Sequence, residues 1–79
     1  NPDTVLPFSL PEAAIVRLAV FNILGQEVRV LAQGRIEAGY HKLVWDGKDD
    51  SGRQMASGIY LTRMVAGEFV GINKMLMIK

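Results

Sequence analysis

The sequence predicts an antiparallel β-sandwich, an all-β fold in which two sheets pack face to face. Six or seven short apolar segments follow one another in 79 residues, and within several of them apolar and polar residues alternate. Glycine, asparagine and aspartate separate these segments, and no stretch shows a convincing helical period. A chain of many short strands buries its apolar faces by packing one sheet on another.

The expected strands follow in order along the chain. They cover residues 4–10, 15–22, 27–32, 40–46, 53–55, 58–65 and 69–78, with 33–39 as a loop and 53–55 as a short strand. Alternation places Leu18 on one face of the second strand and Arg17 on the other. Pro7 has no N–H to donate, so the first strand is expected at a sheet edge or broken in two. Gly25 and Gly67 are expected to take positive φ in hairpin turns.

A helical alternative exists for the second segment. Ser9 stands three residues before Glu12, with Pro11 between them, which is the pattern of a helix N-terminus followed by an apolar run. The β-branched and aromatic residues of 15–21, and the turn residues directly after them, favour a strand.

The composition indicates a single small domain over residues 1–79 and argues against several classes of function. With 49% hydrophobic and 22% charged residues, the chain is too apolar for a disordered tail. Nine basic residues are nearly balanced by eight acidic ones, so we expect no nucleic-acid partner. The sequence has no cysteine and no apolar run of membrane-helix length, and from its first residues we expect no signal peptide within it. We therefore expect no membrane insertion and no cofactor.

Three aspartates after the 40–46 strand raise the question of a metal or catalytic site. A calcium loop needs oxygen ligands at alternating positions, but counted from Asp46 the second position holds the cation Lys48. Three carboxylates on one exposed turn also lack the burial that raises a catalytic pKa. Turn formation explains more, because aspartate, serine and glycine favour tight turns. The turn residues are Asp46, Gly47, Asp49, Asp50, Ser51 and Gly52. A weak metal site made of the three aspartates and backbone carbonyls stays open as an alternative.

Trp45 and His41 are the other candidates for chemistry. Trp45 shares a strand face with Leu43, so we expect it in the core, although an exposed tryptophan would stack on a sugar. His41 is the only histidine, and we expect it on the strand surface rather than in a catalytic triad or a metal site.

Ordered motifs across nearly the whole chain carry a family resemblance. The motifs are NPDTVLPFSLP, then VRLAVFNILGQEV, then WDGKDDSGRQMASGIY, and finally KMLMIK. In this order and spacing they resemble the C-terminal sorting domain (type A) of the type IX secretion system. That family is similar in pattern to the Ig-like domain of the flagellar hook-capping protein. Phe21 stands where tyrosine is usual, and Pro7 lies inside the first strand.

The resemblance implies an Ig-like antiparallel β-sandwich of about seven strands and a non-enzymatic function. Such a module directs a larger cargo protein for type IX secretion and attachment to the cell surface. Its partners would be the outer-membrane secretion machinery and an upstream cargo domain in the same precursor. The protein would then cross the periplasm of a Gram-negative bacterium, and residues 1–79 would be the C-terminal module of a longer secreted protein.

The resemblance also assigns roles to residues. The Tyr60 hydroxyl is expected to bond back to the preceding loop, as in the tyrosine corner of Ig-like domains. The residues with a structural role in the motifs are Trp45, Asp46, Gly47, Asp50, Gly52, Gly58 and Tyr60. The last strand, with Lys74, Met75 and Lys79, is the expected recognition surface, read by strand addition if it lies at a sheet edge. Its plain structural alternative is that it only closes the sandwich.

Two other functions stay open. An Ig-like domain of a flagellar hook-capping-type protein would serve in assembly beside a second β domain. A carbohydrate-binding accessory module would need an exposed row of planar aromatic side chains. An enzyme is the least favoured class.

Overall fold

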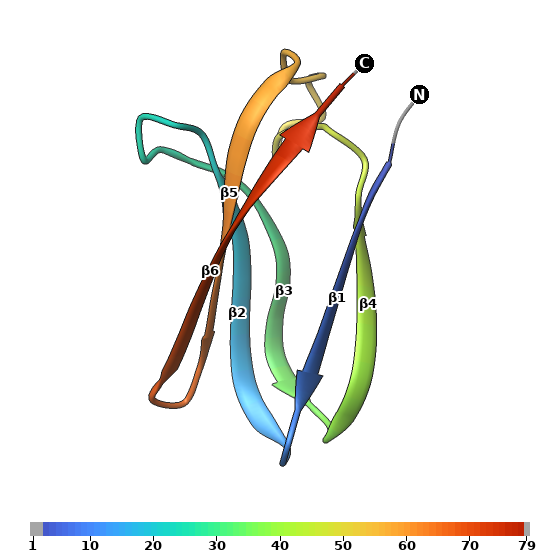
Figure 1. The fold of residues 1–79 in the computed structure, drawn as a ribbon, viewed down its shortest axis with the longest axis vertical. Helices are drawn as coiled ribbons and strands as arrows, with labels where there is room; N and C mark the ends of the chain where they lie inside the picture. The colour runs from blue at the N-terminus through green and yellow to red at the C-terminus, as the bar shows by residue number, and fades with distance from the viewer. Residues whose placement is uncertain (1–2, 79) are drawn as a thin grey trace.

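Six strands form two antiparallel sheets that face each other in the computed structural model, which describes residues 3–78 (Figure 1). The strands are β1 (Thr4–Leu10), β2 (Ala14–Phe21), β3 (Glu27–Ile36), β4 (Gly39–Trp45), β5 (Gly58–Ala66) and β6 (Phe69–Met77). One sheet pairs β1 with β4, and the other has the order β3-β2-β5-β6. The predicted antiparallel β-sandwich is therefore confirmed, with six strands in place of seven.

The missing strand is the one predicted over residues 53–55. Instead of a strand, this segment makes a single antiparallel bridge, between Lys48 and Gln54. The backbone bonds that flank the bridge run from Asp49 N–H to the Arg53 carbonyl and from Met55 N–H to the Gly47 carbonyl. The helical alternative for the segment after Ser9 is wrong, because that segment is β2. No helix long and apolar enough to cross a membrane occurs within residues 3–78.

The loop predicted over residues 33–39 is mostly strand. β3 continues to Ile36, which pairs with Ala14 at the start of β2. Within this polar stretch Gly34 has φ +133, a backbone conformation that glycine adopts without strain. The polar composition of residues 33–36 did not predict a strand, because this part of β3 forms by pairing with β2.

The structure places Pro7 and the hairpin glycines as the sequence predicts. β1 pairs only with β4, so Pro7 lies in an edge strand as predicted. Gly25 and Gly67 have φ of +82 and +62 in the β2–β3 and β5–β6 turns. These turns connect antiparallel neighbours and set the register of the four-stranded sheet.

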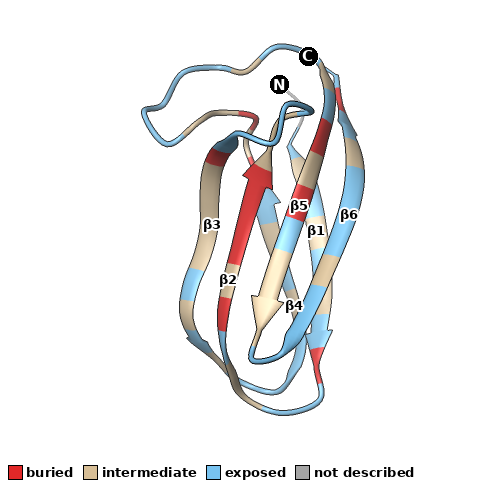
Figure 2. Cartoon of the chain, turned by 90° about the vertical axis from the view of Figure 1, so that its left-hand side faces the viewer, coloured by how far each residue is buried: buried red, intermediate tan, exposed pale blue. Residues whose placement is uncertain are grey.

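Two apolar clusters fill the space between the sheets. The first contains Val20, Val28, Trp45, Tyr60 and Met77, and the second contains Leu10, Val16 and Leu18. Leu31 packs against both clusters. Figure 2 shows the buried positions concentrated on β2 and on part of β5, whereas β6 is largely exposed. Trp45 is fully buried, as its alternation with Leu43 predicts.

The outer face of the four-stranded sheet stays apolar and uncovered. Its exposed side chains include Ile15, Ile59, Val70, Ile72 and Leu76. They are interrupted by a few charges, among them Arg63 and Lys74. This face is therefore available for contact with another chain, as is the open edge of β6.

Candidate functional site

The loop between β4 and β5 brings the acidic residues together, and each has a local bonding role. Asp46 leaves the end of β4, and its Oδ1 accepts the Lys48 backbone N–H at 3.0 Å and Arg29 Nη1 at 2.9 Å. The Lys48 amide, and after it the Arg29 guanidinium, hold the pKa of Asp46 below its usual value. Asp46 is thus an ionised turn former paired with a cation.

The side chain of Asp49 stabilises the next turn by accepting hydrogen bonds from it. Its Oδ1 accepts the Arg53 backbone N–H at 2.9 Å and the Ser51 backbone N–H at 3.0 Å. The Ser51 hydroxyl also donates to this oxygen, at 2.8 Å. These bonds, led by the Arg53 amide, lower the pKa of Asp49 from 3.8 to about 2. A carboxyl that serves as a general acid near neutral pH needs a shift in the opposite direction.

Asp50 attaches the loop to β3. Its backbone N–H donates to the Val28 carbonyl at 3.0 Å, and its Oδ1 accepts the Val30 N–H at 3.2 Å. The side chain is exposed and lies 3.9 Å from Arg29 Nε. The loop therefore covers the first residues of β3. It bonds to backbone groups on the open edge of β3, the side that does not pair with β2.

Trp45 and Tyr60 anchor the two ends of the loop in the core. Their rings meet edge to face with centroids 5.0 Å apart, and the Trp45 indole N–H donates to the Lys48 carbonyl at 2.9 Å. The Tyr60 hydroxyl donates to the Ala56 carbonyl at 2.6 Å, which is the bond back to the preceding loop expected for a tyrosine corner. Gly58 begins β5 two residues earlier.

Gly47 and Gly52 supply the backbone conformations that the turns need. Their φ angles are +81 and +89. A Cβ at Gly47 would lie 2.8 Å from Gln54 Nε2, so this glycine is required by space as well as by conformation. Nothing lies within 4 Å of a Cβ placed at Gly52.

Arg29, on β3, is the residue of this site that sequence reasoning missed. Its Nη1 donates to both Asp46 Oδ1 and the Lys48 carbonyl, at 2.9 and 3.0 Å. The available signal was a single arginine between two valines on a strand, in a chain with an unpaired acidic cluster. The sequence alone did not show that β3 passes beside that cluster.

Bonded in this way, the acidic loop is a structural unit held by its own turns and by β3. The Oδ1 atom of each carboxylate accepts from backbone amides, a hydroxyl or a guanidinium group, and a cation bound to these oxygens would have to displace those donors. Among residues 3–78, no three acidic, histidine or cysteine side chains form a group that could hold a metal ion.

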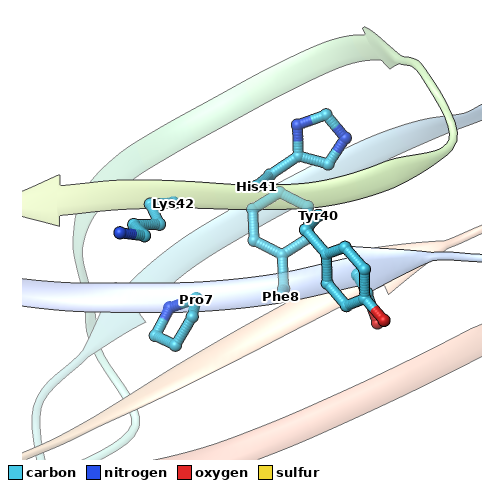
Figure 3. A pocket seen from close by; sticks show the side chains of 6 residues that line it. Pro7, Phe8, Tyr40, His41 and Lys42 are labelled. Atoms are coloured by element: carbon cyan, nitrogen blue, oxygen red, sulfur yellow. The ribbon is translucent and has the colours of Figure 1, made fainter.

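A shallow apolar pocket of about 400 Å³ lies on β1 and β4, away from the acidic loop (Figure 3). Tyr40, 93% exposed, and His41 line it from β4, and Pro7 and Phe8 line it from β1. His41 lies on the strand surface as expected, and it is half-buried there because its ring stacks on Phe8 with centroids 5.2 Å apart. Of the aromatic side chains that the structure describes, only Tyr40 and Phe69 are exposed, and they lie on different sheets.

The predicted recognition residues lie on an open sheet edge. β6 pairs with β5 alone, so its other side has no neighbouring strand. Lys74 is exposed, Met75 is half-buried against the first core cluster, and Lys79 lies outside the described residues. Their role in recognition stays a prediction.

Comparison with known proteins identifies the fold class and then the family. Over 95% of this chain, the structure is similar to a solved structure of FlgD from P. aeruginosa, with a TM-score of 0.71 and 26% sequence identity. Together with the tyrosine corner, this similarity establishes an Ig-like β-sandwich. A family model described as the FlgD Ig-like domain matches residues 3–68, and the chain belongs to that family.

The same comparisons limit what can be transferred. The match covers 61% of the solved FlgD chain. No match among curated proteins was found. Neither match points to a type IX sorting domain, so the resemblance is supported for the FlgD Ig-like fold and not for the sorting family. The FlgD Ig-like family is a structural, non-catalytic one.

Proposed function

We propose that this domain is a non-enzymatic assembly module of the flagellar hook-capping type. The observation that carries the proposal is the FlgD Ig-like family match over residues 3–68, joined to a fold similar to that of FlgD from P. aeruginosa. In such a module the function lies in surfaces that contact other chains, and the polar groups of the loops serve the fold.

Three features of the structure support this proposal. The carboxylates of the acidic loop are used in turns and in the bond to β3. The pocket on β1 and β4 is shallow, and most of its accessible lining is apolar. The outer face of the four-stranded sheet, in contrast, displays several exposed aliphatic side chains with a few charges between them. Large exposed apolar faces typically mark protein interaction sites.

A domain deletion in the organism that encodes this chain tests the proposal. The codons for residues 1–79 are removed in frame, and hooks are counted by electron microscopy. A loss of hooks, reversed by the intact gene, is the expected result. Normal hooks and normal motility in the deletion strain would overturn the hook-capping proposal.

Type IX sorting is the second candidate, favoured by one structural feature. The strand that carries Lys74 and Met75 is an edge strand, as strand addition by a secretion receptor requires. Under this proposal the partners are the outer-membrane machinery and an upstream cargo domain. The same deletion strain would then keep its hooks and would retain the cargo in the periplasm instead of releasing it to the cell surface or the medium.

A further inference from the structure

Arg63 differs from the other arginines of the chain, because it has no carboxylate partner. Each of the others forms an ion pair at 2.6–3.2 Å: Arg17 with Glu27, Arg29 with Asp46, Arg35 with Glu37, and Arg53 with Asp49. Arg63 is exposed on β5, and it makes no ion pair or hydrogen bond within residues 3–78. A guanidinium group offers a planar fork of N–H donors that matches a carboxylate. The fold itself therefore makes no use of this group.

Apolar side chains surround Arg63 on the outer face of the four-stranded sheet. Side chains alternate along β5, so Leu61 and Val65 point to the same side as Arg63. Across the sheet, Arg63 pairs in register with Ile72 of β6, which is 62% exposed, and with Ala19 of β2. Figure 2 views the sheet from this side, with β1 and β4 behind it. The charge of Arg63 thus stands within an apolar face.

A second cation without a partner lies beside Arg63. Lys74 follows Ile72 by two residues on β6 and therefore points outward as well. Its register partner is Leu61, so Lys74 is a diagonal neighbour of Arg63, with Cα atoms about 7–8 Å apart. Lys74 also makes no ion pair or hydrogen bond in the part of the chain that the structure describes. The two positive charges repel each other, and both would attract an anion placed between them.

We propose that this face docks a different polypeptide, which presents an aspartate or glutamate to Arg63 from a surface with aliphatic side chains. Arginine is enriched among the residues that dominate binding at protein interfaces. Its guanidinium is more weakly hydrated than an ammonium and can bind a carboxylate through two bonds. The inference rests on the proposed function in one respect, namely that the domain acts by contacting another chain.

A second copy of this chain does not offer the required carboxylate. Among residues 3–78, the acidic side chains without an ion pair are Asp3, Glu12 and Glu68, and none of them lies in a strand. The outward residues of the β1–β4 sheet include no acid; they are Val5, Pro7, Ser9, Tyr40, Lys42 and Val44. On the four-stranded sheet, Glu27 already pairs with Arg17. The charge pattern therefore favours a different chain as the partner.

An anionic membrane is the rival ligand for an apolar face that carries cations. Segments that recognise anionic lipids typically carry clusters of about four to eight lysines or arginines. Among the described residues of this face, the unpaired cations are Arg63 and Lys74, because Arg17 and Arg35 are paired with glutamates. Two neighbouring cations on a sheet match a single protein carboxylate better than a lipid surface.

Zero-length cross-linking detects this contact directly. A carbodiimide couples a lysine amine to a carboxyl group that touches it, and Lys74 supplies the amine next to Arg63. Gently opened cells of the organism that encodes this chain are treated with the reagent, and coupled peptides are identified by mass spectrometry. Lys74 should be coupled to an aspartate or glutamate of one other protein.

Charge reversal at Arg63 tests whether the contact depends on this arginine. Arg63→Glu should lower the yield of the Lys74 cross-link about 30-fold, as the loss of a dominant interface residue does. Arg63→Gln removes the charge without reversing it and should lower the yield less. Lys42→Glu is the matched control, since it makes the same change of charge at an exposed cation on the other sheet, and it should leave the yield unchanged. Immunoblots check that each variant is present at the parental level.

The outcomes separate this inference from its rivals and from the proposed function. No coupling of Lys74 to another protein, or equal coupling in the parent and in Arg63→Glu, would overturn it. Coupling to Glu12 or Glu68 of a second copy would also overturn it. Flotation of the chain with phosphatidylglycerol vesicles, lost in Arg63→Glu, would identify a lipid as the ligand instead. A deletion strain with normal hooks would overturn the hook-capping proposal alone, because the cross-link is measured independently of hooks.

Discussion

Trp45 connects the core to the acidic loop at the scale of a single residue. Its ring is fully buried against Tyr60, and its indole N–H donates to the Lys48 carbonyl, which also accepts Arg29. The side chain therefore fills the first core cluster and at the same time holds the turn that follows β4.

Replacing Trp45 by alanine should lower the free energy of unfolding by about 3–5 kcal/mol. The reason is a large cavity plus the lost indole donor to the loop. Urea denaturation of the parent and the variant measures the change. Tyr40→Ala is the control, because Tyr40 is 93% exposed and should have little effect. A Trp45→Ala variant as stable as the parent would contradict the core assignment.

Gly47 and Gly52 allow conformation and space to be separated. Both have φ near +85, so alanine at either position adopts a left-handed conformation that costs roughly 1–2 kcal/mol. At Gly47 the new Cβ also meets Gln54 Nε2 at 2.8 Å, whereas Gly52 has open space. Gly47→Ala should therefore be the more destabilising of the two in thermal unfolding. Equal effects would show that the contact with Gln54 is relieved at no cost.

The β4–β5 loop acts as one element whose stability depends on ionised carboxylates. Hydrogen bonds, above all from the Arg53 amide, lower the pKa of Asp49 to about 2, from 3.8. A lowered pKa means that the folded state favours the charged form, so its contribution is complete above about pH 4 and is lost as the pH falls towards 2. Asp46 and Glu27 are shifted in the same direction.

Unfolding free energies measured by urea between pH 5 and pH 2 should fall with decreasing pH. In Asp49→Asn the fall should be shallower, because one titrating group is gone while an amide oxygen still accepts backbone N–H groups. If the parent and the variant show the same pH dependence, the Asp49 carboxylate is not the group that stabilises the loop.

Asp50→Asn should keep the fold, because asparagine offers the same acceptor to the Val30 N–H and favours similar turns. Calcium should add little to the melting temperature of the parent, since the loop oxygens already accept protein donors. A ligand present at 100 times its dissociation constant stabilises by about 2.7 kcal/mol. A clear calcium-dependent rise, absent in Asp46→Ala, would restore the metal-site alternative.

How much of each element could be predicted depended on whether local or distant residues determine it. β1 has the predicted bounds, 4–10, and the Pro7 edge, the Gly25 and Gly67 turns and the buried Trp45 follow from local pattern and alternation. The extension of β3 to Ile36 comes from pairing with β2, which the polar stretch does not encode locally. The bond from Arg29 on β3 to Asp46 in the acidic loop likewise joins residues that are 17 positions apart in sequence.

At the scale of the whole molecule, the sequence predicts the β-sandwich fold, but it does not predict which surfaces of the sandwich bind other chains. Seven strands were expected, and the acidic segment became a bonded loop in place of the seventh. The motif resemblance led first to a sorting domain, but the supported family is that of FlgD Ig-like domains. The motifs WDG and SGIY form the loop and the tyrosine corner. They therefore indicate that this chain shares the Ig-like fold, and they do not indicate that it is secreted by the type IX system.

The central claim is that the polar chemistry of this domain stabilises its own fold and that its function is assembly. The most direct test is a hook count by electron microscopy in cells whose protein carries Asp46→Asn, Asp49→Asn and Asp50→Asn together. These changes remove the carboxylate charges and keep acceptors for the turns. We predict hooks at the wild-type number. A variant that remains folded and present in the cell but makes as few hooks as the domain deletion would contradict the claim.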